Sequence, residues 1–468
     1  MDSKNRIWLV LALIIGTILI SGCNKSRCGD GICQGWEERR EDCPEDCGEI
    51  NEPAEELSSD PPSQERLVKS ITVLVDEIGG RVDWSHESDL IAFSKTSEDG
   101  YFDLYIMNPD GTNQRCLTCD KPQVPQKNNG QPAWHPSGEF IVFQAQDPDL
   151  EVPPSVQYLE AYMTQGGAGI HNNLWLTNKN GTEFFQLTHI KSGEGTLHPH
   201  FSHDGSKLFW TEREKCDNGG QWILKIADFV VNDTGPHLEN EISFRPRGEE
   251  ETFYESHGFT LDDRKVIFSA DFGRADKFDM DIWIMDLETL ELTQLTDSIY
   301  VWDEHAQISP DGKKIIWISS QGYEWPASEE WTQALKTDYW IMDIDGSNKQ
   351  RLTFFNEPGY PEYDQQERII AADSSWNEDG TKIVATLGVM KGLRAKGRRI
   401  VLIELNEGLF GEGVNDEEDD AGNTRYDPGS SIETIIETIT EKAVERPGLQ
   451  LMKQYLSTGK SDDGYYDV

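Results

Sequence analysis

Basic residues are scarce in this sequence. Its 468 residues include 42 Lys and Arg against 85 Asp and Glu, which gives a formal net charge of −43. Proteins that bind nucleic acid neutralise phosphates with a surplus of positive charge, and anionic membrane surfaces attract basic segments for the same reason. The charge balance therefore excludes nucleic acid and anionic lipid surfaces as general partners of the chain.

Catalytic signatures are missing as well. The chain has no G-x-S-x-G elbow, no H-E-x-x-H motif and no phosphate-binding loop of the G-x-x-x-x-G-K-[ST] type. These absences exclude the common serine hydrolase, zinc peptidase and P-loop classes. With 36% hydrophobic and 10% aromatic residues, the chain still has enough apolar side chains to form a core.

Long apolar runs are absent after the first 23 residues. Lys4 and Arg6 precede an apolar run over residues 7–20, which ends at Ser21-Gly22-Cys23. A helix of this length spans about 21 Å, less than the roughly 30 Å hydrocarbon core of a bilayer. The run therefore predicts a signal peptide at residues 1–22 rather than a membrane span.

The end of this run resembles the lipobox of prokaryotic lipoproteins, in which small residues precede a cysteine that is acylated and becomes the new N-terminus. The resemblance implies that Cys23 is a lipid anchor. The remaining chain would then lie on the extracytoplasmic side of the cell membrane. A cysteine that merely lies near an ordinary cleavage site is the alternative.

A short acidic segment contains four further cysteines, at Cys28, Cys33, Cys43 and Cys47. They lack the C-x2-C pairs typical of zinc sites, and cysteines of exported proteins usually pair, so we expect two disulfides in a small module at residues 23–48. Its acidic side chains are either calcium ligands or a solvated surface. We also expect a local disulfide between Cys116 and Cys119, which leaves Cys216 as a free thiol.

One pattern recurs six times beyond a Pro-, Ser- and Glu-rich linker at residues 49–69. Each copy is a short apolar strand, a turn with Asp or Gly and an alternating strand, and a second half with the same design follows most copies. The copies start at Val82, Pro132, Pro199, His257, Ala306 and Ser374. Their mean period of about 58 residues suits a four-stranded propeller blade with insertions.

The repeat predicts an all-β fold, a six-bladed β-propeller of four-stranded blades over residues 70–405. The last copy lacks an outer strand, while an alternating segment from Ser70 to Val75 precedes the first copy and has no partner. We therefore expect this segment to complete the last blade. Residues 406–468 predict an acidic linker and a short amphipathic helix, which docks either on the propeller or on a partner.

Three recurring motifs carry a family resemblance. The SPDG turn at Ser309, the IMDIDG turn at Ile341 and the Leu-Thr pairs that end most copies resemble the repeats of TolB-like six-bladed propellers. The resemblance covers roughly residues 70–405. The separate N-terminal α/β domain of TolB itself has no counterpart in this sequence.

Polar residues recur at one position of the repeat. The anchor of each copy is an aromatic residue, or Ile308 in the fifth copy: Trp84, Trp134, Phe201, Phe259, Ile308 and Trp376. The residues three positions before these anchors are Arg81, Gln131, His198, Ser256, His305 and Asp373, with His257 next to Ser256. Six radial strands bring these positions to one channel mouth. Imidazoles with an amide or carboxylate there predict a site for a divalent metal such as manganese or zinc, whereas a water-filled polar channel is the alternative.

A more distant resemblance names possible ligands for this metal. Oligogalacturonate lyases have related propellers and hold a metal with histidines and a glutamine in this kind of channel. The resemblance implies His198, His257, His305 and Gln131 as the equivalent ligands.

Aromatic and basic residues in the loops on the same face predict a binding surface. The predicted ligand-binding residues are Arg81 and Asp373 at the channel mouth, together with Trp325, Trp331, Lys391 and Arg394 in the loops. Aromatics stack on sugars or on protein surfaces, and a basic mouth on an acidic body attracts anionic ligands. Local balancing of nearby carboxylates is the alternative role of the basic residues.

The sequence thus predicts a membrane-anchored extracytoplasmic propeller that binds a protein partner, or an anionic small molecule or glycan, without catalysis. One alternative is a metal-dependent, lyase-like enzyme acting on an anionic carbohydrate. Another is a purely architectural component of a surface layer.

The anchor is open to a direct test. We expect Cys23→Ala to release the protein from membranes or to leave its precursor unprocessed, because the acylated thiol is gone. Fractionation and lipid labelling measure this, with Cys28→Ala as the control that keeps the anchor. Unchanged labelling and membrane retention in Cys23→Ala would refute the prediction.

Overall fold

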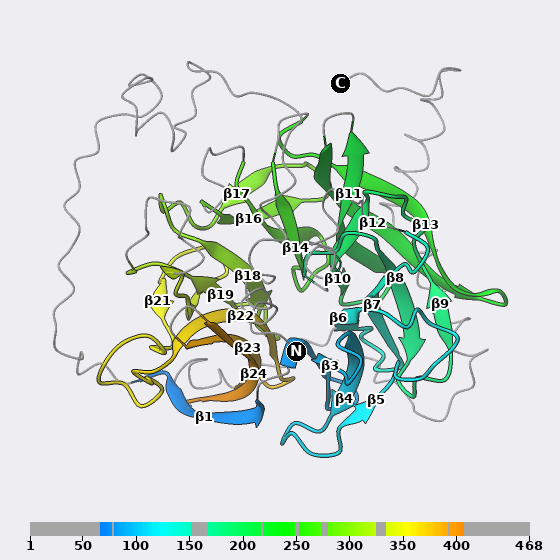
Figure 1. Cartoon of the computed structure of the whole chain (residues 1–468). Helices are drawn as coiled ribbons and strands as arrows, with labels where there is room; N and C mark the ends of the chain where they lie inside the picture. Colours follow the sequence, from blue (N-terminus) through cyan, green and yellow to red (C-terminus); the bar gives the residue numbers. More distant parts are fainter. Residues whose placement is uncertain are drawn as a thin grey trace, which may run out of the picture. The chain divides into compact units, whose positions relative to one another are not determined.

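The computed structural model describes residues 66–76, 79–150, 164, 167–216, 219–248, 252–272, 279–323, 334–391 and 394–406. Within these residues, 24 strands form six four-stranded sheets arranged in a ring (Figure 1). The predicted six-bladed β-propeller is confirmed. The signal peptide, Cys-rich module, flexible linker and C-terminal tail lie outside the described residues. No helix among the described residues is long and apolar enough to cross a membrane.

The innermost strands of neighbouring blades contact one another around the ring. They are β2 (Gly79–Ser85), β6 (Asn129–Trp134), β10 (Gly195–Phe201), β14 (Tyr254–Phe259), β18 (Asp303–Ile308) and β22 (Arg368–Trp376). The second strands are β3 (Leu90–Thr96), β7 (Phe140–Gln146), β11 (Lys207–Cys216), β15 (Lys265–Ala270), β19 (Lys314–Ser319) and β23 (Lys382–Lys391).

Two further strands complete each blade towards the rim. The third strands are β4 (Phe102–Met107), β8 (Asn172–Asn178), β12 (Gly219–Asn232), β16 (Asp281–Asp286), β20 (Asp338–Asp343) and β24 (Arg394–Leu405). The outermost strands are β5 (Arg115–Cys116), β9 (Phe184–Gln186), β13 (Gly235–Phe244), β17 (Leu292–Gln294), β21 (Gln350–Arg351) and β1 (Val68–Val75).

The second strands are apolar on both faces because each blade packs between two others. In β3, Ile91, Ala92 and Phe93 are consecutive and all fully buried. Asp-Gly turns precede three of these strands, β11, β19 and β23. In the turn before β19, Asp311 Oδ1 accepts hydrogen bonds from the Ser309 hydroxyl and the Lys313 amide, and Gly312 adopts a left-handed φ of 72°.

Every innermost strand carries a break in its pairing with the second strand. The breaks fall between Gly79 and Val82, Gly130 and Ala133, Leu197 and His200, Ser256 and Gly258, Glu304 and Gln307, and Ala371 and Ser374. Such bulges bend a strand and redirect its side chains. Gln131, His198 and His305 lie at bulges with left-handed φ values of 55°, 45° and 54°, a conformation that non-glycine residues rarely adopt.

The ring closes by pairing the first and the last strand of the propeller sequence. As predicted, β1 completes the last blade and pairs antiparallel with β24, with Ile71 opposite Ile403. The Ser70 hydroxyl donates to Glu404 Oε2 over 2.7 Å, and the Asn406 amide donates to the carbonyl of Leu67. Closure leaves β24 with no free edge.

Deleting residues 68–75 should destabilise the whole ring. The deletion exposes the edge of β24 and removes the buried side chains of Val68 and Val75, so the free energy of unfolding should fall by at least about 3 kcal/mol. Thermal and denaturant unfolding measure this loss. Val73 is half-exposed on the same strand, so Val73→Thr is a control expected to behave like the wild type. A deletion variant with the wild-type transition would place the seam elsewhere.

Candidate functional site

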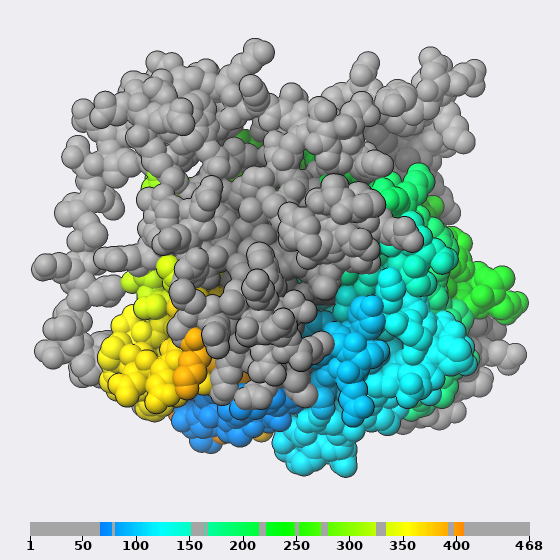
Figure 2. Space-filling model, in the orientation of Figure 1, coloured from blue at the N-terminus to red at the C-terminus, as the bar shows by residue number. Residues whose placement is uncertain are grey.

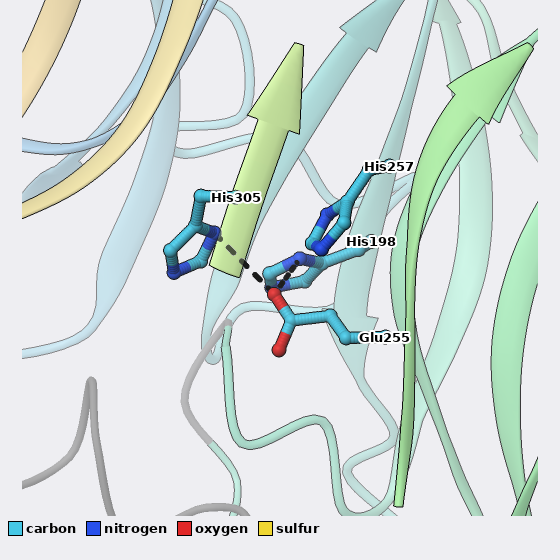
Figure 3. Close-up of side chains that lie close together, drawn as sticks. All are labelled: His198, Glu255, His257 and His305. Atoms are coloured by element: carbon cyan, nitrogen blue, oxygen red, sulfur yellow. Dashed lines mark ion pairs between the residues drawn. The ribbon is translucent and has the colours of Figure 1, made fainter. Parts of the chain in front are cut away.

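Three blades bring a cluster of ligand-type side chains together. His198 comes from β10, Glu255 and His257 come from β14, and His305 comes from β18. One donor atom from each side chain lies within 4.8 Å of the others, and all four residues are buried. Figure 3 shows the four side chains converging from their strands on one point.

Glu255 lies at the centre of this histidine–glutamate cluster. Its Oε1 atom is 2.6 Å from His198 Nδ1 and 3.4 Å from His305 Nδ1 (Figure 3). The rings of His198 and His305 stack with centroids 5.5 Å apart, and the His257 ring lies 6.0 Å from that of His305. His257 Nε2 pairs with the hydroxyl of Ser269 at 2.6 Å.

Burial and neighbouring charges set different protonation states in the cluster. Burial lowers the pKa of His198 and holds that of His257 well below its usual value, so both imidazoles are neutral and keep a lone pair for a ligand. Burial also disfavours charge on His305, but Asp373 and Glu255 outweigh it and raise the His305 pKa to about 9. Burial alone would raise the pKa of Glu255, but the charges of His198 and His305 outweigh it and lower that pKa.

A second glutamate lies beside the cluster in the opposite state. Glu304 Oε2 is 3.8 Å from His305 Nε2, and burial followed by the charge of Glu255 raises the Glu304 pKa well above its usual value. Three buried carboxylate oxygens around the cluster have no well-directed hydrogen-bond donor: Glu255 Oε1, Glu304 Oε1 and Asp373 Oδ2. Buried oxygens without donors favour a bound cation.

Arg81 connects the cluster to the remaining polar positions of the inner ring. Its guanidinium donates from Nη1 to Gln131 Oε1 over 3.1 Å and from Nη2 to His200 Nε2 over 2.7 Å. Its Nε is 3.5 Å from Asp373 Oδ1, which in turn lies 3.2 Å from His305 Nδ1. Arg81 therefore links β2 to three other innermost strands.

The predicted site residues fall into four groups. Arg81, Gln131, His198, His257, His305 and Asp373 belong to one buried network. Lys391 is exposed and donates to Gln366 Oε1 over 3.1 Å. Trp325, Trp331, the Arg394 side chain, Cys23, Cys28, Cys33, Cys43 and Cys47 lie outside the described residues. Cys116 and Cys119 form a disulfide.

Two acidic members of the site were not foreseen from the sequence. Glu255 takes the fourth place in the cluster, whereas the side-chain oxygen of Gln131 accepts a hydrogen bond from Arg81. Glu255 lies two residues before His257, and the bulge between Ser256 and Gly258 lets both side chains reach the cluster. That spacing is the signal that could have identified it. Glu304 adjoins His305 directly, so only the bulge brings both towards the site.

No protein-family model and no curated protein sequence matches this chain. Similar solved structures include TolB from Acinetobacter baumannii, at 17% identity and a TM-score of 0.44, covering 69% of this chain and 66% of that chain. Putative TolB from Agrobacterium tumefaciens has 15% identity and a TM-score of 0.41, and the match covers 60% of this chain and 87% of that chain. An oligogalacturonate lyase in complex with manganese has 12% identity and a TM-score of 0.42, covering 73% and 96%. The likeness is one of fold. This chain spans just under two thirds of the Acinetobacter protein.

Removing the charge of Arg81 should destabilise the propeller. Arg81→Met leaves Asp373 buried without its cationic partner and Gln131 Oε1 without its donor, so the free energy of unfolding should fall by about 3–5 kcal/mol in denaturant titrations. Arg81→Lys keeps the charge and should lose less. Arg264 is exposed, and Arg264→Met should stay within about 0.5 kcal/mol of the wild type. Wild-type stability in Arg81→Met would contradict this account.

Proposed function

We propose that this protein is an extracytoplasmic binding propeller that holds a divalent metal ion in the histidine–glutamate cluster at its channel mouth. The metal would hold an anionic group of a protein partner, a small molecule or a glycan, and the protein would not catalyse a reaction. The observation that carries the proposal is the approach of His198, Glu255, His257 and His305 to within 4.8 Å in a buried position.

The donor set suits a metal between manganese and zinc. Three imidazoles and one carboxylate are ligands that these ions accept, and a site that leaves a coordination position open can bind a ligand group. Two of the imidazoles are neutral and the carboxylate is ionised, which is the protonation state that ligands need. His305, whose pKa is raised to about 9, would release its proton when it binds the metal. The left-handed φ values of His198 and His305 support a functional role, because such strain accumulates at binding sites.

The position outside the cytoplasm rests on the sequence. A short apolar run that ends in a lipobox-like Cys23, followed by a linker without apolar character, would hold the propeller near the outer side of the cell membrane. From there the channel mouth would meet extracellular or periplasmic ligands.

One observation favours the second candidate, a metal-dependent, lyase-like enzyme for anionic carbohydrates. Glu255 has a lowered pKa and Glu304 a raised one, so two carboxyl groups with different proton affinities lie in one site. Neighbouring groups whose pKa values diverge in this way are typical of acid and base pairs. Eliminative cleavage would generate an unsaturated sugar with ultraviolet absorbance. A metal-loaded protein that produces none from polyuronate substrates is a binding protein.

Metal analysis tests the proposed function. Tag-free wild-type protein should carry about one equivalent of divalent metal, and after chelation it should rebind manganese or zinc in calorimetry with the same stoichiometry. The triple variant with Ala at His198, His257 and His305 should bind less than about a tenth of an equivalent, because a single carboxylate holds these ions weakly.

The matched control is His189→Ala, since His189 is exposed and lies outside the cluster. It should retain the full equivalent. Wild-type protein that remains metal-free after exposure to manganese and zinc, or a folded triple variant that still binds one equivalent, would exclude the site.

A further inference from the structure

A second chemical cluster lies at the rim of the first blade. The disulfide between Cys116 and Cys119 starts at the end of β5, and both cysteines are half-buried rather than enclosed. A carboxylate oxygen of Asp103, on β4, and the two sulfur atoms all lie within 4.8 Å of one another. This Asp103–disulfide cluster combines a C-x2-C pair with a buried carboxyl group.

Asp103 belongs to a structural motif that the blades repeat. The Thr118 hydroxyl donates to Asp103 Oδ1 over 2.7 Å and accepts from the Leu104 amide, which fastens the Leu-Thr segment to the third strand. The same contacts join Thr296 to Asp281 and Thr353 to Asp338 in the fourth and fifth blades.

The first blade departs from this motif at one position. Two residues before the Thr, the fourth blade has Gln294 and the fifth has Arg351, and each donates a hydrogen bond to the second oxygen of its aspartate. The first blade has Cys116 there instead. The second oxygen of Asp103 accepts a hydrogen bond from the Ser97 hydroxyl instead. Cys116 takes the place of the side-chain donor in the sequence, so Asp103 lies beside a disulfide where the other aspartates lie beside an amide or a guanidinium.

The surroundings of the two sulfur atoms suit exchange chemistry. The backbone N–H of Cys119 points at Cys116 Sγ over 2.9 Å, and such a donor stabilises a thiolate on Cys116 once the bond opens. The Tyr105 hydroxyl lies 3.3 Å from Cys119 Sγ. Lys95 Nζ lies 5.2 Å from the centre of the Tyr105 ring and adds positive charge nearby.

Asp103 is suited to exchange protons with the departing sulfur. Burial raises its pKa, and the charges of Asp99 and Asp120 add to the effect, while hydrogen bonds from Ser97 and Thr118 oppose it. A carboxyl group with a raised pKa can relay a proton between solvent and a thiolate. The bridge itself closes a very short loop, and short loops contribute least to stability by restricting the unfolded chain. The disulfide therefore contributes little to the stability of the fold.

We propose that the Asp103–disulfide cluster is a thiol–disulfide exchange site that oxidises a dithiol of a partner protein. A partner thiolate attacks Cys116 Sγ, the Cys116–Cys119 bond breaks, and Cys119 leaves as a thiolate that takes a proton from Asp103. The second partner thiolate then attacks the partner sulfur of the mixed disulfide and releases Cys116 as a thiolate. Cys116 then takes a proton from solvent, and solvent restores the proton on Asp103. The partner dithiol loses two electrons and two protons as it gains a disulfide, and the cysteine pair gains two electrons and two protons and becomes a dithiol.

Redox titration of the full chain provides the test. The protein is equilibrated in buffers of reduced and oxidised glutathione and quenched by alkylation, and the peptide that carries both cysteines is quantified by mass spectrometry. We expect this pair to be reduced reversibly by millimolar glutathione while circular dichroism shows a folded propeller. In single variants, the Cys116 thiol left by Cys119→Ser should alkylate at least about ten-fold faster at neutral pH than the Cys119 thiol left by Cys116→Ser.

Asp103→Asn should slow oxidation of a synthetic dithiol peptide by about ten-fold or more, because the proton donor is lost. Asp281→Asn is the matched control, since Asp281 has the same threonine contact but no cysteines beside it. A pair that stays oxidised in the folded protein, or equal alkylation of the two single variants, would overturn the proposal. The alkylation comparison leaves Asp103 intact, so it decides the matter even if Asp103→Asn unfolds.

Discussion

The bulge in each innermost strand is the constraint on which the site depends. A regular strand turns alternate side chains to opposite faces of its sheet, where they pack between blades. The bulges in β10, β14 and β18 interrupt this alternation and let His198, His257 and His305 approach one another. A left-handed φ costs a non-glycine residue on the order of 1–3 kcal/mol, and the packed ring supplies the stability that sustains it.

Charge is distributed unevenly between the surface and the centre of this protein. The chain is strongly acidic, yet Arg81 is almost completely buried and contacts groups from three other blades. Its contacts with Asp373, Gln131 and His200 hold these polar side chains in fixed orientations around the inner ring. Any metal or anion that enters meets groups that are already oriented, so little reorganisation opposes binding.

Sequence patterns located most of the fold and part of the site. The repeated turns and Leu-Thr pairs identified six blades, and the surplus segment at Ser70 identified the seam, because a ring leaves no strand unpaired. The bulges lie just before the anchors of the repeat, so counting back from the anchors located His198 and His305. Glu255 escaped that count because it lies four residues before Phe259 rather than three. The sequence pattern also could not show that Gln131 accepts a hydrogen bond from Arg81, because contacts between different blades depend on the three-dimensional structure.

The seam between β1 and β24 joins two segments that are far apart in the sequence. Ser70 and Glu404 bond across a sequence separation of 334 residues, so one partner is synthesised almost first and the other almost last. Contacts between such distant residues slow folding, because the intervening chain must be ordered before they form. A chain interrupted before β24 would keep β1 as an open edge, the kind of surface that aggregates.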